Sequence, residues 1–93
     1  MFQVNEYFEG KVKSLAFENE KGKFTTGVMA KGEYEFGTST KEVMTLVSGS
    51  WKIKLPGSSE FVDYPQGSSF EVDANVKFAL QVAEDSAYLC QYE

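Results

Sequence analysis

The run from Glu42 to Gly49 joins a carboxylate to an apolar stretch that ends in a turn glycine. In a metal site built on this spacing, two histidines precede the Glu by four and six residues. Those positions hold Thr38 and Phe36, and the chain contains no histidine. Imidazole is a preferred ligand of most transition metals in proteins. The pattern therefore retains the carboxylate, strand and turn of such a pocket but lacks its histidine ligands, and we expect metal-free chemistry here.

Glu42 has two interpretations. It is either a solvated charge at a strand end, or a carboxylate at the mouth of a barrel beside Thr38, Ser39 and Thr40. At a mouth it can hold sugar hydroxyl groups, or act as a general acid if burial raises its pKa. Without histidine, proton transfer near neutral pH falls to Glu, Asp, Lys, Tyr, Cys90 or water.

Three further side chains are candidates for ligand binding, each with a simpler structural alternative. Tyr34 can stack on a planar base, although most aromatic residues of a small β-barrel pack in its core. Lys13 can neutralise an anion, although a solvated Lys on an exposed strand face is the more common case. Gln81 offers the donor and the acceptor that a nucleobase edge requires, or it satisfies a backbone group.

Composition narrows the class of protein. The 93 residues make a single domain, 1–93, and a hydrophobic content of 42% is enough for a folded core. All nine basic residues are Lys against fourteen acids, for a net charge of -5. Such a surface is unsuited to the phosphate backbone of a nucleic acid, so we expect no nucleic-acid partner.

The expected location follows from cysteine usage and hydropathy. Cys90 is the single cysteine, so it cannot form an intramolecular disulfide, which favours a reducing compartment. The N-terminus lacks the basic segment and apolar run of a signal peptide. No apolar stretch approaches the roughly 20 residues of a membrane helix. We expect a cytoplasmic protein with no membrane partner.

Alternating runs rich in Val, Phe, Tyr and Thr predict β-strands along the whole chain. Short turn signals of Gly, Pro, Asn and Asp separate these runs. The expected strands are 12–17, Thr25–Ala30, Gly32–Phe36, Val43–Ser48, Trp51–Leu55, Glu60–Tyr64, Ser68–Val72, Val76–Val82 and Ala87–Tyr92. Eight or nine short strands at regular spacing are typical of an antiparallel sandwich or barrel.

A second turn resembles part of the cupin pattern. Pro65-x-Gly67 lies between two expected strands, where Pro fixes φ and Gly permits positive φ. In cupins such a turn opens the second conserved motif, with a His three residues after the Gly and an Asn four residues further on. Those places hold Phe70 and Ala74. Two half-motifs in the right order predict an all-β, single-domain, cupin-like antiparallel β-barrel (jelly roll).

An ordered set of segments resembles the small cupin-type pyrimidine/purine nucleoside phosphorylases of bacteria. The segments are Asn5-Glu-Tyr-Phe8, Gly10-Lys-Val-Lys-Ser14, Gly27-Val-Met29, Gly32-Glu-Tyr34-x-Phe36, Met44-Thr45, Ser48-Gly49, Leu55-Pro56 and Tyr88-Leu-Cys90. No single segment is diagnostic, but the set covers essentially the whole chain in the family's order. In this family an Arg often follows the Cys of the last strand, and Gln91 stands there. The change matters if that Arg binds phosphate.

The resemblance implies a one-domain cupin, commonly a homodimer, that needs no cofactor and no metal. It implies that inorganic phosphate is the co-substrate, and that diverse purine and pyrimidine nucleosides are split into free base and α-D-ribose 1-phosphate. Phosphorolysis needs an anion cradle, contacts to ribose hydroxyl groups and a hydrogen bond to the departing base. The predicted roles are phosphate binding by Lys13, Thr38 and Ser39, nucleoside binding by Tyr34 and Gln81, and catalysis by Glu42.

Two rival hypotheses belong to other classes. A non-catalytic cupin that binds a nucleoside, sugar or other small metabolite would explain the absence of both His and Arg. A metal-dependent isomerase or dioxygenase would require metal to remain bound after purification. Release of base only in the presence of phosphate separates the enzyme from the first rival, and an elemental assay tests the second.

Overall fold

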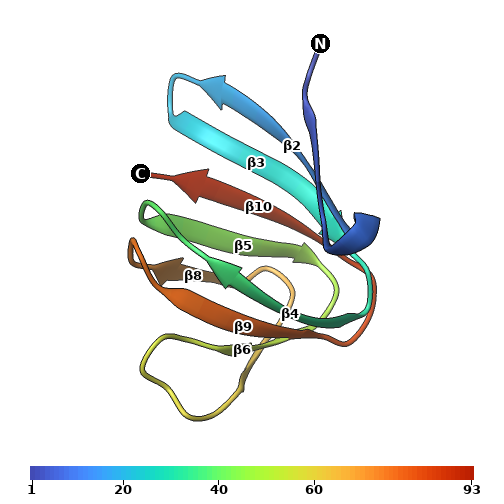
Figure 1. Ribbon diagram of the computed structural model, residues 1–93, viewed down its shortest axis with the longest axis vertical. Helices are drawn as coiled ribbons and strands as arrows, with labels where there is room; N and C mark the ends of the chain where they lie inside the picture. Colours follow the sequence, from blue (N-terminus) through green and yellow to red (C-terminus); the bar gives the residue numbers. More distant parts are fainter.

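The computed structural model describes residues 1–93 as ten β-strands and one short 3-10 helix (Figure 1). The elements are β1 (Val4–Tyr7), η1 (Phe8–Gly10), β2 (Val12–Asn19), β3 (Gly22–Met29), β4 (Gly32–Gly37), β5 (Glu42–Ser48), β6 (Trp51–Lys54), β7 (Val62–Tyr64), β8 (Ser69–Val72), β9 (Lys77–Val82) and β10 (Ser86–Tyr92). The nine expected strands are all present, within a few residues of the predicted bounds. No helix has the length and apolar character needed to cross a membrane.

The strands form two antiparallel sheets. One has six strands in the order β1-β2-β3-β10-β5-β8, and the other has four in the order β4-β9-β6-β7. In Figure 1, β4, β9 and β6 lie along one side of the larger sheet. Non-consecutive strands pair in both sheets, as β10 does with β3 and β5. This arrangement is the jelly roll predicted from the two half-motifs, and its short antiparallel strands are those that the alternating runs predicted.

The N-terminal strand is the main element that the sequence did not indicate. Strand β1 pairs with β2 at the edge of the larger sheet, in a register that places Tyr7 opposite Val12. Only four residues long and mostly exposed, it shows no alternation of apolar and polar residues. The strands of the β2–β3 hairpin also extend beyond the expected bounds, because Asn19 pairs with Gly22 across a two-residue turn.

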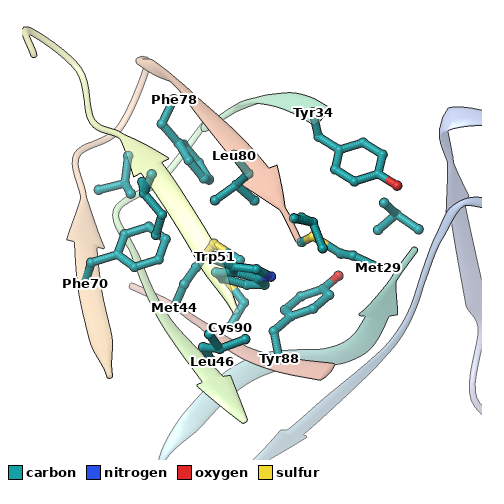
Figure 2. Packing of buried hydrophobic residues seen from close by; sticks show 14 residues of the cluster. Met29, Tyr34, Met44, Leu46, Trp51, Phe70, Phe78, Leu80, Tyr88 and Cys90 are labelled. Atoms are coloured by element: carbon teal, nitrogen blue, oxygen red, sulfur yellow. The ribbon is translucent and has the colours of Figure 1, made fainter. Parts of the chain in front are cut away.

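A core of buried apolar side chains fills the space between the sheets (Figure 2). Leu46, Trp51, Ile53 and Leu80 are each only 1% exposed, and they come from strands of both sheets. A side chain at Gly49 would collide with Ser86, and Gly49 has a φ of 120°. The turn glycine that ends the Glu42 run is therefore required both by its backbone conformation and by close packing.

Alternation along the strands decides which side chains reach the interior. In the six-stranded sheet, even positions of β2, β5 and β10 and odd positions of β3 face the core. The antiparallel register then aligns core-facing residues in rows across the strands. The outermost of these, here called the outer row, holds Glu18, Lys23, Tyr92, Glu42 and Val72. It lies where the β2–β3 hairpin, the C-terminus and the start of β5 come together (Figure 1).

Candidate functional site

A cavity of about 150 Å³ lies between the two sheets, directly inside the outer row. It is lined by Tyr7, Ser14, Thr25, Met29, Phe36, Gly37, Met44, Tyr88, Cys90 and Tyr92. Larger hollows of about 470, 330, 320 and 160 Å³ lie elsewhere. None of them gathers as many buried polar groups from different strands. The interior cavity is therefore the candidate site.

Two hydroxyl pairs form the polar wall of this cavity. The Oγ1 atom of Thr25 lies 3.0 Å from the hydroxyl oxygen of Tyr92. The Tyr88 and buried Ser14 hydroxyls also line the cavity, and Ser14 opposes part of the rise in the pKa of Tyr88. Burial raises the pKa of Tyr88 to about 12 and also raises the pKa of Tyr92. All four groups are therefore neutral hydroxyls at physiological pH, able both to donate and to accept, as contacts to a sugar require.

Glu42 lies beside this wall and contacts it through Cys90. The Sγ atom of Cys90 donates a hydrogen bond to Oε1 of Glu42 at 3.4 Å. Burial raises the pKa of the Glu42 carboxyl, and the hydrogen bond from Cys90 opposes part of that effect. The condition stated for general acid catalysis, a carboxyl whose pKa is raised by burial, is thus met at Glu42.

Cys90 itself is not set up as a nucleophile. The residue is only 2% exposed. Burial raises the pKa of its thiol to about 12, and the neighbouring charge of Glu42 acts in the same direction. Since the thiolate is the reactive form, Cys90 acts as a hydrogen-bond donor to Glu42 and as an apolar wall of the cavity.

The side chain of Thr38 is hydrogen-bonded within a turn of the protein. Its Oγ1 donates to the carbonyl oxygen of Asp73 at 2.6 Å and accepts from the backbone N–H of Val76 at 3.2 Å. Backbone hydrogen bonds with Val76 and Asn75 reinforce this contact. Ser39, the other predicted phosphate-binding hydroxyl, is exposed in the loop before β5. Neither residue lines the cavity.

Lys13 and Gln81 lie on outer faces of the sheets. The ammonium of Lys13 is 3.4 Å from a carboxylate oxygen of Glu6, and both side chains are more than half exposed. Nε2 of Gln81 donates to Oε1 of Glu33 at 3.3 Å on the outside of the four-stranded sheet. The phosphate-binding role of Lys13 and the base-binding role of Gln81 therefore lack a common site in this structure.

Tyr34 lies in the interior, away from the cavity lining. Its hydroxyl donates to the carbonyl oxygen of Ala30 at 2.6 Å, and burial together with the charge of Asp85 raises its pKa. The ring packs 5.0 Å from that of Phe8, centroid to centroid. Among the six residues predicted to form the site, only Glu42 makes a side-chain hydrogen bond to a residue that lines the cavity. The functional roles of all six remain predictions.

The sequence did not single out the cavity hydroxyl groups, because they are distinguished by their core-facing positions on the strands and not by their residue types. Ser14 shares the core-facing side of β2 with Val12, and Thr25 shares that of β3 with Met29. Polar residues at core-facing positions are the signal that would have found them, because buried polar groups need partners. No group of three His, Cys, Asp or Glu side chains lies close enough to hold a metal ion.

Comparison with known proteins assigns the chain to a family. A family model described as "Pyrimidine/purine nucleoside phosphorylase" matches residues 2–92. The chain belongs to the pyrimidine/purine nucleoside phosphorylase family. Proteins of that name from Pseudomonas aeruginosa and Rhodopirellula baltica are 60% and 59% identical, over 99% and 97% of this chain and 99% and 98% of their own lengths. The resemblance stated from the sequence is confirmed, and with it an enzyme of the nucleoside phosphorylase class.

Solved structures confirm the fold. A protein of unknown function from Vibrio parahaemolyticus superimposes with a TM-score of 0.94 at 43% identity, covering 100% of this chain and 99% of the other. An RmlC-like cupin from Shewanella frigidimarina gives a TM-score of 0.77 at 17% identity, covering 99% of this chain and 83% of the other. At that identity the second likeness concerns the fold alone. The predicted cupin-like, all-β architecture is correct.

Proposed function

We propose that this phosphorylase cleaves diverse purine and pyrimidine nucleosides in the interior cavity, with inorganic phosphate as co-substrate and without a metal. An oxygen of phosphate forms a bond to C1′ of the ribose while the C1′–N bond breaks. The base leaves with the electron pair and takes up a proton, and α-D-ribose 1-phosphate remains. The observation that carries the proposal is the Glu42 carboxyl, bonded to Cys90 beside a wall of hydroxyl groups.

The neutral interior suits the sugar. The pairs Thr25–Tyr92 and Ser14–Tyr88 offer donors and acceptors in a region otherwise lined by apolar groups. Hydroxyl groups held in fixed positions can orient the ribose for attack at C1′, and such positioning supplies a large part of enzymatic rate enhancement. Glu42 lies one strand away from these pairs, because it is opposite Tyr92 in the register of β5 and β10. It is therefore the group that protonates the departing base or binds a ribose hydroxyl.

The size of the cavity supports a position for the base at its mouth. A volume of about 150 Å³ equals that of about five water molecules in the liquid. This is room for a ribosyl group, but not for ribose and a purine together. The partly buried Phe36 presents an aromatic ring in the cavity lining. Stacking on aromatic rings tolerates every base, in keeping with a broad range of nucleosides.

A phosphate-dependence assay tests the proposal. Purified protein is incubated with inosine or uridine, with and without phosphate, and free base is measured. Release that requires phosphate supports phosphorolysis, whereas release at the same rate without phosphate indicates hydrolysis and contradicts it. Nucleoside binding with no release of base would favour a metabolite-binding role. Activity that survives chelation and gel filtration, in protein shown free of metal by elemental analysis, supports the metal-free reaction.

We further propose that the enzyme is a homodimer joined through the outer face of the six-stranded sheet. The apolar side chains of Leu15, Val28 and Val47 are 38%, 56% and 53% exposed on that face. Four neighbouring strands spaced about 4.8 Å apart and about six residues long cover roughly 20 × 20 Å. This matches the apolar centre of an interface of the usual size, about 800 Å² per partner.

Light scattering on the double variant Val28→Lys/Val47→Lys tests this dimer. The variant should be monomeric where the wild type is dimeric. Val62→Lys is the matched control, because Val62 is 55% exposed on the smaller sheet. A wild-type monomer, or a dimer unaffected by the double variant, would refute the proposed interface.

A further inference from the structure

The cavity has no positive charge in its lining, although phosphorolysis must bring an anion to C1′. Its ten lining residues include no Lys, and the nearest ionisable carboxyl is that of Glu42. An unpaired phosphate beside a carboxylate in a partly buried site is unfavourable. Because the chain has nine Lys and no Arg, the lysines are the side chains that can supply the compensating charge.

Strand geometry singles out one lysine. Lys23 occupies an odd position of β3, the side that carries Thr25 and Met29 into the interior. It is the only lysine at a core-facing position of a strand. The others lie on outer faces or in turns: Lys11, Lys13, Lys21, Lys31, Lys41, Lys52, Lys54 and Lys77. Lys13 and Lys41 are in addition engaged in ion pairs with Glu6 and Glu71.

The neighbours of Lys23 connect it to the cavity. Lys23 lies opposite Tyr92 in the register of β3 and β10, two residues from Thr25, and these two neighbours line the cavity as a hydroxyl pair. On its other side Lys23 faces Glu18. The lysine is exposed and makes no ion pair, so its ammonium is free to bind a ligand.

We propose that Lys23 is the phosphate-binding residue of this enzyme, with the hydroxyls of Thr25 and Tyr92 beside it. The inference rests on the proposed phosphorolysis and names where its co-substrate binds. In the outer row, Lys23 and Glu42 stand on either side of Tyr92, with their Cα atoms about 10 Å apart at the usual strand spacing. A ribose held between them receives phosphate from the Lys23 side and releases the base on the Glu42 side. Bond formation and bond cleavage at C1′ then occur on opposite faces of the sugar.

Paired kinetic variants test the assignment. Lys23→Gln should raise the KM for phosphate at least tenfold and leave the KM for nucleoside within about twofold, as expected when a charge-assisted contact is lost. Lys13→Gln is the matched control, because Lys13 is an exposed strand lysine on the outer face, and it should change neither constant. Glu18→Gln removes the carboxylate opposite Lys23 and should lower the KM for phosphate about two- to fivefold, on the scale of an exposed charge pair.

Titration of inorganic phosphate into the unreacted protein, followed by NMR, separates the site from the reaction. Saturable shifts around residues 23–25 and 90–92 that are lost in Lys23→Gln support the site, even if the wild type shows no turnover and the proposed reaction fails. A phosphate KM unchanged in Lys23→Gln but raised in Lys13→Gln would overturn the assignment in favour of the outer face. Phosphate-dependent activity with identical phosphate titrations of wild type and Lys23→Gln would also overturn it.

Discussion

Replacement of Glu42 by Gln is the most informative single change at the site. The amide keeps the shape of the side chain and an oxygen that can still accept the hydrogen bond from Cys90, now 3.4 Å from Oε1. It cannot give up a proton near neutral pH. If Glu42 protonates the departing base, kcat should fall about 10²- to 10⁴-fold, the range of general acid catalysis. That loss corresponds to about 2.7 to 5.4 kcal/mol of transition-state stabilisation.

The same variant should gain stability at high pH. Burial raises the pKa of Glu42 in the folded state, so the folded protein binds this proton more tightly than the unfolded chain does. The contribution to stability is fully present below the unfolded pKa and is lost as the pH rises through the folded pKa. The Glu42→Gln variant has no ionisable group at this position, so it does not lose this stability as the pH rises. Its Tm should therefore exceed that of the wild type at about pH 8, and the difference should shrink towards about pH 4.

Initial rates of base release and thermal unfolding at the two pH values check both expectations. Glu71→Gln is a suitable control, since Glu71 lies on the next strand with its side chain 64% exposed and paired with Lys41. Unchanged kinetics in Glu42→Gln would favour the alternative interpretation of Glu42 as a solvated charge at a strand end. A loss of activity accompanied by a lower Tm at both pH values would show a structural role, and would equally refute the reasoning.

Three further changes test other parts of the structure. In the native protein, Cys90 should resist thiol reagents that label it after unfolding. Because the hydrogen bond from Cys90 lowers the pKa of the neighbouring Glu42 carboxyl, Cys90→Ala should raise that pKa. The fall of kcat on the alkaline side of its pH profile should then move to higher pH. Gly49→Ala should lower the Tm by about 8 °C or more, since backbone strain and collision with a neighbouring serine together cost at least about 2 kcal/mol. Gly57 also has a positive φ but has open space around it, so Gly57→Ala should lower the Tm by less. An equal loss of Tm in both variants would refute the packing argument. Thr25→Val removes the bond to the tyrosine hydroxyl of β10 and should reduce kcat/KM about tenfold. Thr45→Val removes a comparable bond to Ser69 on the outer face and should leave kcat/KM unchanged, and equal effects of the two changes would contradict a cavity role.

The strands were predictable because their signal is local. Alternation of apolar and polar residues between Gly, Pro and Asn turns is a property of five or six consecutive residues, and it located nine of the ten strands. Strand β1 escaped because its stability comes from pairing with β2 rather than from burial of its own side chains. The pairing of β10 with β3 and β5 is likewise non-local, so the order of strands within each sheet was not predictable from any strand's own residues.

The site was less predictable because both faces of the larger sheet carry apolar residues. On β2, Val12 faces the core while Leu15 lies on the opposite, outer face, so alternation alone does not reveal which side is buried. If the wrong face of a strand is taken as the buried one, every candidate site residue on that strand is replaced by its neighbour on the opposite face. Lys13 and Ser14 differ by a single position, yet one lies in an exposed ion pair and the other lines the cavity. Glu42 did not suffer from this ambiguity, because its spacing to Gly49 fixed its place at the start of a strand.

Depth within the cavity explains how the charges are distributed. An unpaired charge deep between the sheets would cost several kcal/mol, and the inner rows accordingly hold only neutral groups such as Ser14, Thr25 and Tyr88. Charged side chains face the interior only in the outer row, where Lys23 is exposed and Glu42 is half-buried. A reaction that joins an anion to a neutral sugar and protonates a leaving base needs this division. The sugar meets hydroxyl groups inside, while phosphate and proton are handled at the mouth, where solvent keeps the charged side chains stable before substrate arrives.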